Sequence, residues 1–297
     1  MPAFERENVV RATLIALLFP VLYLLVMFVV DNGYSLVWAW RHPGSTTADM
    51  TAQLNSAALV LLLVTVAVFF VVVVITFAIR RRSLPKRVMW RAVVPKPVYG
   101  FVVLLVAGLI FTGFLVASFI PASWVEGDTV TGVMAQPNPV LIILVVGIVA
   151  PVGEEVAFRG LMMTRLIDRV APWLAVGLPF VAFCAFHLLD SLGHIVTVIP
   201  LAISVCLAFY WTRSFKVPLL IHVLYNAVLA VVTALSTNVA DTTTEASSGF
   251  DVTSLLVGLL GVAAVVVALV SIYRDTHVKV KDFPPPHAED LIPEVAS

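Results

Sequence analysis

Two adjacent carboxylates lie inside a long apolar stretch of this sequence. Glu154 and Glu155 belong to the segment GEEVAFRG, residues 153–160, which ends an apolar run that begins at Pro139. An ionisable side chain near the centre of a bilayer costs about 2.5–3.5 kcal/mol, so its presence there indicates a functional site. Glu155 and Arg159 are four residues apart and share a helix face, whereas Glu154 is turned roughly 100° away. The spacing predicts an ion pair between Glu155 and Arg159 and leaves Glu154 available as a general base or acid.

Two later apolar runs each carry a histidine with a second side chain on the same helix face. Phe183 and His187 are four residues apart in FCAFH, and His222 and Asn226 are four residues apart in HVLYN. Glutamate and histidine together can activate a water molecule or bind a divalent metal. A side-chain amide can donate a hydrogen bond to a developing oxyanion. If the three runs wall one cavity, with Glu154 in it, the set could hydrolyse a peptide bond without a covalent intermediate.

Two polar residues that follow His187 are interpreted as structural. Asp190 begins a tight connection, DSLGH, and is interpreted as a cap for the turn. His194 ends that connection at the start of the next apolar run, where a histidine at the membrane interface is the simplest interpretation. Asp190 could also touch the site, but neither residue is assigned to it.

The composition excludes a soluble globular protein. Of the 297 residues, 61% are hydrophobic and 12% are charged, which is typical of a chain with several membrane spans. We therefore expect an all-α bundle of about eight transmembrane helices. The expected spans are residues 10–30, 54–79, 98–120, 139–163, 172–189, 195–211, 217–235 and 252–273.

The positions of the basic residues predict an orientation for these spans. If both termini are cytoplasmic, every Lys and Arg except Arg41 falls on the cytoplasmic side, as the positive-inside rule requires. This orientation places the GEEVAFRG segment toward the cytoplasmic half of its span. We expect a multi-pass protein of the plasma membrane, of bacterial origin, with the eukaryotic endoplasmic reticulum as the alternative location. The lipid bilayer is an expected partner, and nucleic acid is not.

The three motifs together resemble those of a known family. EEVAFR, FCAFH and HVLYN, in this order on separate apolar runs, resemble the motifs of the CPBP intramembrane proteases, which include the CAAX prenyl endopeptidases and the bacterial Abi and bacteriocin-immunity-like proteins. The resemblance covers about residues 140–230 and implies an intramembrane endopeptidase that acts on a membrane-embedded or lipidated substrate. The implied catalytic residues are Glu154, His187, His222 and Asn226, supported by Glu155, Arg159 and Phe183.

The resemblance also implies a role for each residue. Glu154 would be the general base on water, His187 would hold that water or a metal, and His222 and Asn226 would hold the water or polarise the carbonyl. A zinc ion bound by Glu154, His187 and His222 and a metal-independent glutamate mechanism both stay open. Whether the substrate is prenylated also stays open.

The family resemblance divides the chain into four parts. Residues 138–236 would form a CPBP-like catalytic core, after an N-terminal three-helix membrane region over residues 1–137. A loop and the last transmembrane helix would occupy residues 237–273. A cytoplasmic tail, residues 274–297, is predicted to be disordered because proline and acidic residues replace the apolar ones.

Two other functions and one geometric problem stay open. Glutamate and histidine also form proton relays in transporters, although the chain shows no internal repeat, and a non-catalytic scaffold or immunity protein is the third candidate. The geometric problem is depth, because counting at about 1.5 Å per residue places His187 late in its span and His222 early in its own. A tilt of the spans, a kink at Pro179 or a later start to the fifth span would have to bring the two histidines together.

Overall fold

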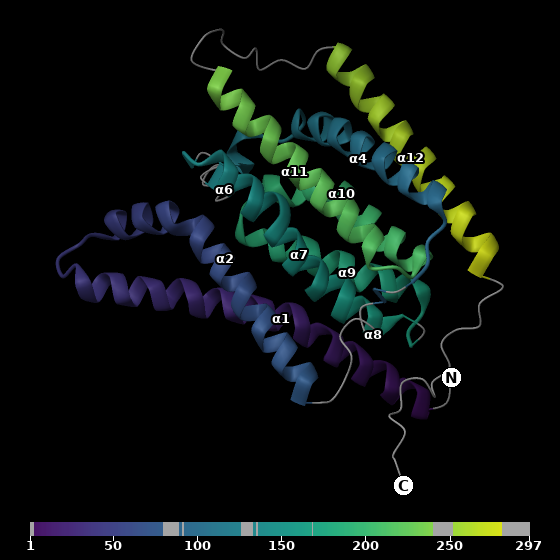
Figure 1. The fold of residues 1–297 in the computed structure, drawn as a ribbon, viewed down its shortest axis with the longest axis horizontal. Coiled ribbons are helices and arrows are strands. Elements are labelled where there is room, and N and C mark those ends of the chain that lie inside the picture. The colour runs from purple at the N-terminus through teal and green to yellow at the C-terminus, as the bar shows by residue number, and fades with distance from the viewer. Residues whose placement is uncertain are drawn as a thin grey trace.

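The computed structural model describes residues 3–79, 89–90, 92–125, 133–134, 136–167, 169–239 and 252–280 (Figure 1). This described part is a bundle of helices without a strand, which confirms the all-α, polytopic prediction. Its elements are α1 (Ala3–Arg41), α2 (Thr47–Ile79), α4 (Lys96–Ala117), η1 (Ala122–Trp124), α6 (Pro139–Leu144), η2 (Val145–Val149), α7 (Ala150–Glu155), η3 (Val156–Met163), α8 (Thr164–Leu166), α9 (Pro172–Phe186), η4 (His187–Leu189), α10 (Leu192–Thr212), α11 (Lys216–Val239) and α12 (Val252–Val280).

Seven helices in the described ranges are long and apolar enough to cross a membrane. They are Val9–Arg41, Thr47–Ile79, Lys96–Ala117, Pro139–Leu166, Leu192–Thr212, Lys216–Thr233 and Val252–Thr276. The remaining expected span corresponds to α9, which has 15 residues. At 1.5 Å per residue α9 is about 22 Å long, which is shorter than the ~30 Å hydrocarbon core of a bilayer. The chain is therefore a multi-pass membrane protein, and its described ranges contain seven helices long enough to span a bilayer and one short apolar helix.

The segment that carries the glutamates is one continuous helical rod that contains two π-helical stretches. α6, η2, α7, η3 and α8 follow one another without a break from Pro139 to Leu166, and η2 and η3 are π-helical. Short π-helical stretches are rare and frequently mark functional sites. α1 packs on η3, α2 packs on α7 and η2, and α11 packs on η2 and α7. The glutamate segment is therefore enclosed by elements from both ends of the chain.

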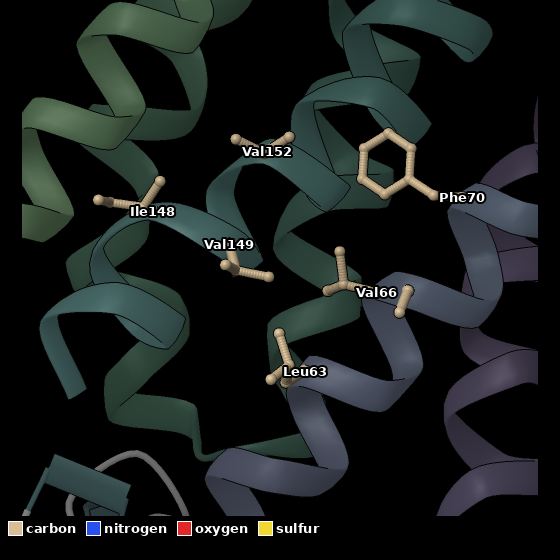
Figure 2. Close-up of a pocket in the computed structure, with 7 residues that line it drawn as sticks. Leu63, Val66, Phe70, Ile148, Val149 and Val152 are labelled. Carbon is tan, nitrogen blue, oxygen red and sulfur yellow. The ribbon is translucent and has the colours of Figure 1, made fainter. Parts of the chain in front are cut away.

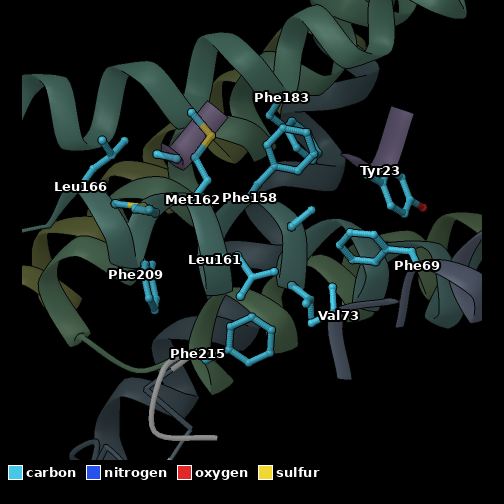
Figure 3. Packing of buried hydrophobic residues seen from close by; sticks show 14 of the residues in the cluster. Tyr23, Phe69, Val73, Phe158, Leu161, Met162, Leu166, Phe183, Phe209 and Phe215 are labelled. Atoms are coloured by element: carbon cyan, nitrogen blue, oxygen red, sulfur yellow. The ribbon is translucent and has the colours of Figure 1, made fainter. Parts of the chain in front are cut away.

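An aromatic cluster joins α1 and α2 to the central helices (Figure 3). Tyr23 of α1 and Phe69 of α2 meet edge to face with ring centroids 5.0 Å apart. Phe158 of η3 and Phe183 of α9 meet in the same way at 5.2 Å. All four side chains are almost completely buried, so this cluster fixes the position of η3 relative to α9.

The C-terminal helix α12 lies against α4 (Figure 1). It ends at Val280 and so includes the first residues of the segment predicted to be a disordered tail. The remainder of that segment, residues 281–297, and most of the polar loop before α12 lie outside the described residues. α4 and α12 approach closely at Gly108, where an added Cβ would lie 2.8 Å from the carbonyl oxygen of Gly261 and 2.9 Å from the amide nitrogen of Val265.

This contact predicts different effects of alanine at two glycines of α4. Gly108→Ala should destabilise the protein by about 1–3 kcal/mol, because the new methyl group meets backbone atoms that cannot rotate away. Gly100→Ala is the matched control, since an added Cβ at Gly100 has no atom within 4 Å. It should leave stability unchanged or raise it slightly through helix propensity. Thermal unfolding midpoints in detergent measure both variants, and equal midpoints would contradict this account of α4–α12 packing.

Candidate active site

Glu155 and Arg159 form the ion pair that their four-residue spacing predicts. Nη1 of Arg159 donates a hydrogen bond of 2.8 Å to Oε1 of Glu155, and neither side chain is exposed. The arginine is also held from two other helices. Its Nη2 lies 3.4 Å from the carbonyl oxygen of Ala202 in α10, and its guanidinium carbon lies 4.5 Å from the centre of the Phe183 ring in α9. The charge of Arg159 is thus compensated by a carboxylate, a carbonyl and an aromatic face.

Glu155 has a second partner that the spacing does not reveal. Nδ1 of His222, in α11, lies 2.8 Å from the same oxygen, Oε1 of Glu155. An ionised carboxylate only accepts hydrogen bonds, so Nδ1 of His222 carries the proton. The other ring nitrogen, Nε2, lies 3.8 Å from Oε2 of Glu154. Glu155 therefore orients His222 so that its second nitrogen faces Glu154.

Glu154 occupies a different position from its neighbour. Its side chain is 11% exposed, whereas that of Glu155 is fully buried. The hydrogen bonds of Arg159 described above go to Glu155 and α10, so Glu154 does not share that arginine on equal terms. The sequence-based division between a structural Glu155 and a differently placed Glu154 agrees with this geometry.

The residue before Glu154 contacts two helices that the motifs do not include. A Cβ on Gly153 would lie 3.2 Å from both γ-carbons of Val66 in α2 and 3.3 Å from the hydroxyl oxygen of Tyr23 in α1. The Tyr23 hydroxyl is buried and has no hydrogen-bond partner among the described residues. It is a polar group beside the site that sequence reasoning missed, because nothing in an apolar run near the N-terminus indicates contact with residue 153.

Phe183 connects the other members of the set. Its ring lies 4.6 Å from the His187 ring and 5.7 Å from the His222 ring, measured between centroids. Its carbonyl oxygen lies 2.9 Å from Nδ1 of His187, which must carry the proton because a carbonyl only accepts. Residue counting predicted that His187 and His222 lie at different depths. The Phe183 ring nevertheless contacts both histidine rings, so the two motifs are not separated.

Asn226 lies one turn after His222 on α11. Its Nδ2 is 3.4 Å from the carbonyl oxygen of Val146 in the π-helical segment η2. This long hydrogen bond places the amide beside the glutamate segment. The structure thus brings the side chains of Glu154, Glu155, Arg159, Phe183 and His222 together around α7, η3, α9 and α11, with His187 attached through Phe183. Asn226 contacts the same rod earlier, at Val146 in η2.

The turn between α9 and α10 is capped on both sides. Asp190 is the C-cap of η4, where its backbone N–H donates a hydrogen bond of 3.1 Å to the carbonyl oxygen of His187, which agrees with its interpretation as a cap for the turn. Ser191 caps α10, because its Oγ accepts a hydrogen bond of 3.0 Å from the amide of His194. Oδ2 of Asp190 lies 3.8 Å from Nε2 of His194, and the His194 ring is 5.2 Å from the His187 ring.

These three residues form a potential metal-binding group. In the described part of the chain, the donor atoms of His187, Asp190 and His194 all lie within 4.8 Å of one another. The set expected from the family resemblance, Glu154, His187 and His222, is not gathered in this way. The spacing of residues 187, 190 and 194 across a helix–turn–helix connection is the signal that could have identified the group.

Comparison with known proteins identifies the same segment of the chain. A family model described as type II CAAX prenyl endopeptidase Rce1-like matches residues 136–228, which contain all three motifs. The match confirms the resemblance to the CPBP proteases, and it supports peptidase activity at the level of the family. No curated protein and no solved structure matches the chain.

The two adjacent glutamates should differ in their contribution to stability. Glu155→Gln removes the partner of a fully buried arginine and should cost about 3–5 kcal/mol. Glu154→Gln is the matched control, since it changes the same chemistry one residue earlier without removing the Arg159 ion pair, and should cost less than ~1 kcal/mol. Unfolding of both variants in detergent, followed by heat or denaturant, measures the difference. A larger loss for Glu154→Gln would contradict the assignment of Glu155 as the structural carboxylate.

Proposed function

We propose that this protein, whose residues 136–228 match an Rce1-like endopeptidase family, hydrolyses a peptide bond of a membrane-associated or lipid-modified protein. The observation that carries the proposal is the approach of Glu154 to Nε2 of His222 at 3.8 Å, inside a membrane bundle, with His222 oriented from behind by Glu155. This is the arrangement of a general base next to an imidazole that can hold its water.

Each residue then has one role in the reaction. Glu154 removes a proton from water, and the resulting hydroxide attacks the peptide carbonyl carbon. His187 and His222 carry their protons on Nδ1 and so present Nε2 to the water. Asn226 donates its amide N–H to the carbonyl oxygen as negative charge develops there. Glu154 then returns the proton to the nitrogen of the leaving amine as the C–N bond breaks.

The supporting residues act through position. Arg159 holds Glu155, and Glu155 holds the ring of His222, so none of the three can rotate without breaking a buried hydrogen bond. Phe183 packs between Arg159 and the two histidines. This arrangement supports a preorganised site, in which the reacting groups need little movement during the reaction.

An apolar pocket next to this segment suits the membrane-associated part of a substrate (Figure 2). The pocket has a volume of about 280 Å³ and lies between α2 and the segment formed by η2 and α7. Its lining is entirely apolar and consists of Leu63, Val66, Ala67, Phe70, Ile148, Val149 and Val152. Val152 is two residues before Glu154, and Val66 contacts Gly153. We propose that a lipid chain or an apolar side chain of the substrate occupies this pocket.

The domain boundaries and the membrane orientation are part of the same proposal. Residues 138–236 would be the catalytic core, and the N-terminal region, residues 1–137, would contribute the α2 wall of the pocket. The distribution of basic residues favours cytoplasmic termini and an active site toward the cytoplasmic half of the plasma membrane. The mechanism above uses only side chains of the chain and one water molecule.

Replacement of Glu154 tests the proposed reaction. Glu154→Ala removes the general base, and cleavage should fall by about 10²–10⁴-fold. The measurement compares protein termini in membranes of cells that contain the wild-type protein or the variant at matched levels. New peptide ends that occur only with the wild type would identify the substrates and show whether they are lipid-modified.

The same experiment can reject the proposal. Equal sets of termini, with both proteins folded and equally abundant, would exclude Glu154-dependent proteolysis. Loss of a proton-coupled flux in the variant would favour a transporter, and an unchanged phenotype would favour a non-catalytic scaffold. A folded but inactive Glu154→Gln variant serves as the control for effects of side-chain size.

Filling the apolar pocket tests the substrate assignment. Ala67→Phe adds a ring to the pocket lining and should raise the KM for a substrate identified above by about tenfold, because apolar contacts worth roughly 1–3 kcal/mol are lost. Val68→Phe is the matched control on the same helix, since Val68 is exposed but does not line the pocket. Equal KM values for the two variants would place the substrate elsewhere.

A further inference from the structure

The connection between α9 and α10 carries three metal-ligand side chains that the proposed reaction uses only in part. His187 begins η4 directly after α9, Asp190 lies in the turn, and His194 lies in the first turn of α10. Their donor atoms all lie within 4.8 Å of one another, with Oδ2 of Asp190 3.8 Å from Nε2 of His194. His187 is buried, and the other two side chains are partly exposed. The group is therefore open on one side.

The His187 ring and the backbone of the turn are held by hydrogen bonds that face away from the group. Nδ1 of His187 donates to the carbonyl oxygen of Phe183, which leaves Nε2 as the unprotonated nitrogen. Metal-binding histidines in proteins almost always donate their other ring N–H to a carbonyl or carboxylate in this way. The backbone of the turn is also fixed, since the amide of Asp190 donates to the carbonyl oxygen of His187 at 3.1 Å. The Ser191 cap holds the amide of His194.

The chemistry of the donor set selects a class of cation. Two imidazoles and one carboxylate suit zinc and its first-row neighbours, whereas calcium and magnesium prefer oxygen ligands only. Tetrahedral coordination with bonds of about 2.1 Å requires ligand atoms ~3.4 Å apart. The separation of 3.8 Å between Asp190 and His194 is close to this value. Small side-chain rotations would bring the third ligand, His187, into range.

We propose that His187, Asp190 and His194 form a binding site for one divalent cation of the zinc class, with a fourth coordination position open to water. The site shares Nε2 of His187 with the proposed hydrolytic centre, so a bound cation would take the place of the water at that nitrogen. The site includes neither Glu154 nor His222. When bound, such a cation supplies a Lewis acid at the edge of the centre. Metal binding is a separate property from peptide hydrolysis, so failure of either proposal leaves the other intact.

Cobalt binding to the purified full-length protein tests the site. The protein is prepared in detergent without a polyhistidine tag, and Co²⁺ is titrated while the visible d–d absorption and the bound metal per chain are measured. One Co²⁺ per chain is expected for the wild type. Asp190→Asn and His194→Gln each remove one ligand and should weaken binding by about 10–100-fold or more.

His42→Gln is the matched control for adventitious binding to histidine. His42 is exposed and follows α1, and its Nδ1 contacts the carbonyl oxygen of Trp38. Its replacement should leave the affinity for Co²⁺ unchanged. Wild-type affinity in both Asp190→Asn and His194→Gln, or no bound Co²⁺ in the wild type, would overturn the proposal.

A measurement on the wild type keeps the proposal testable if a ligand variant does not fold. Cu²⁺ binds most tightly among these cations, and its electron paramagnetic resonance spectrum reports the number of nitrogen ligands. The measurement uses a background with His277→Gln and His287→Gln, so that only histidines before residue 277 remain. Two imidazole nitrogens per bound Cu²⁺ are expected, and a spectrum without nitrogen coupling would reject the site.

Discussion

The candidate site depends on one carboxylate oxygen. Oε1 of Glu155 accepts hydrogen bonds from Arg159 and from His222, each at 2.8 Å, with all three side chains buried. Burial of an ion pair costs desolvation energy that the pair alone seldom offsets. Here the ring of Phe183 and the carbonyl of Ala202 add further contacts to the arginine. Four helical segments, α7 with η3, α9, α10 and α11, are thereby tied to one point, and this contact decides which groups can face Glu154.

Two chemically identical side chains acquire different properties from this arrangement. Glu155 is enclosed and accepts from both partners through Oε1, whereas Glu154 keeps partial exposure and faces a ring nitrogen that Glu155 has oriented. The π-helical segment η3 begins directly after Glu155, so both glutamates lie at the end of α7.

Two helices outside the matched range and one turn inside it complete the surroundings of the site. Tyr23 of α1 and Val66 of α2 contact Gly153, and α2 forms one wall of the apolar pocket. The α9–α10 turn adds Asp190 and His194 to His187. The short helix α9 explains this last contact, because its early end brings the turn, with its polar residues, next to Phe183 and the site rather than to the far surface.

The sequence by itself determined the helices and the pairs within them. Glu155 with Arg159, Phe183 with His187 and His222 with Asn226 follow from the α-helical repeat, which depends only on local backbone geometry. The contact of His222 with Glu155, the Ser191 cap and the shortness of α9 could not be derived in this way. Only the tertiary structure decided them. The depth and rotation of one helix against another depend on side-chain packing over the whole bundle, and a local sequence pattern does not contain that information.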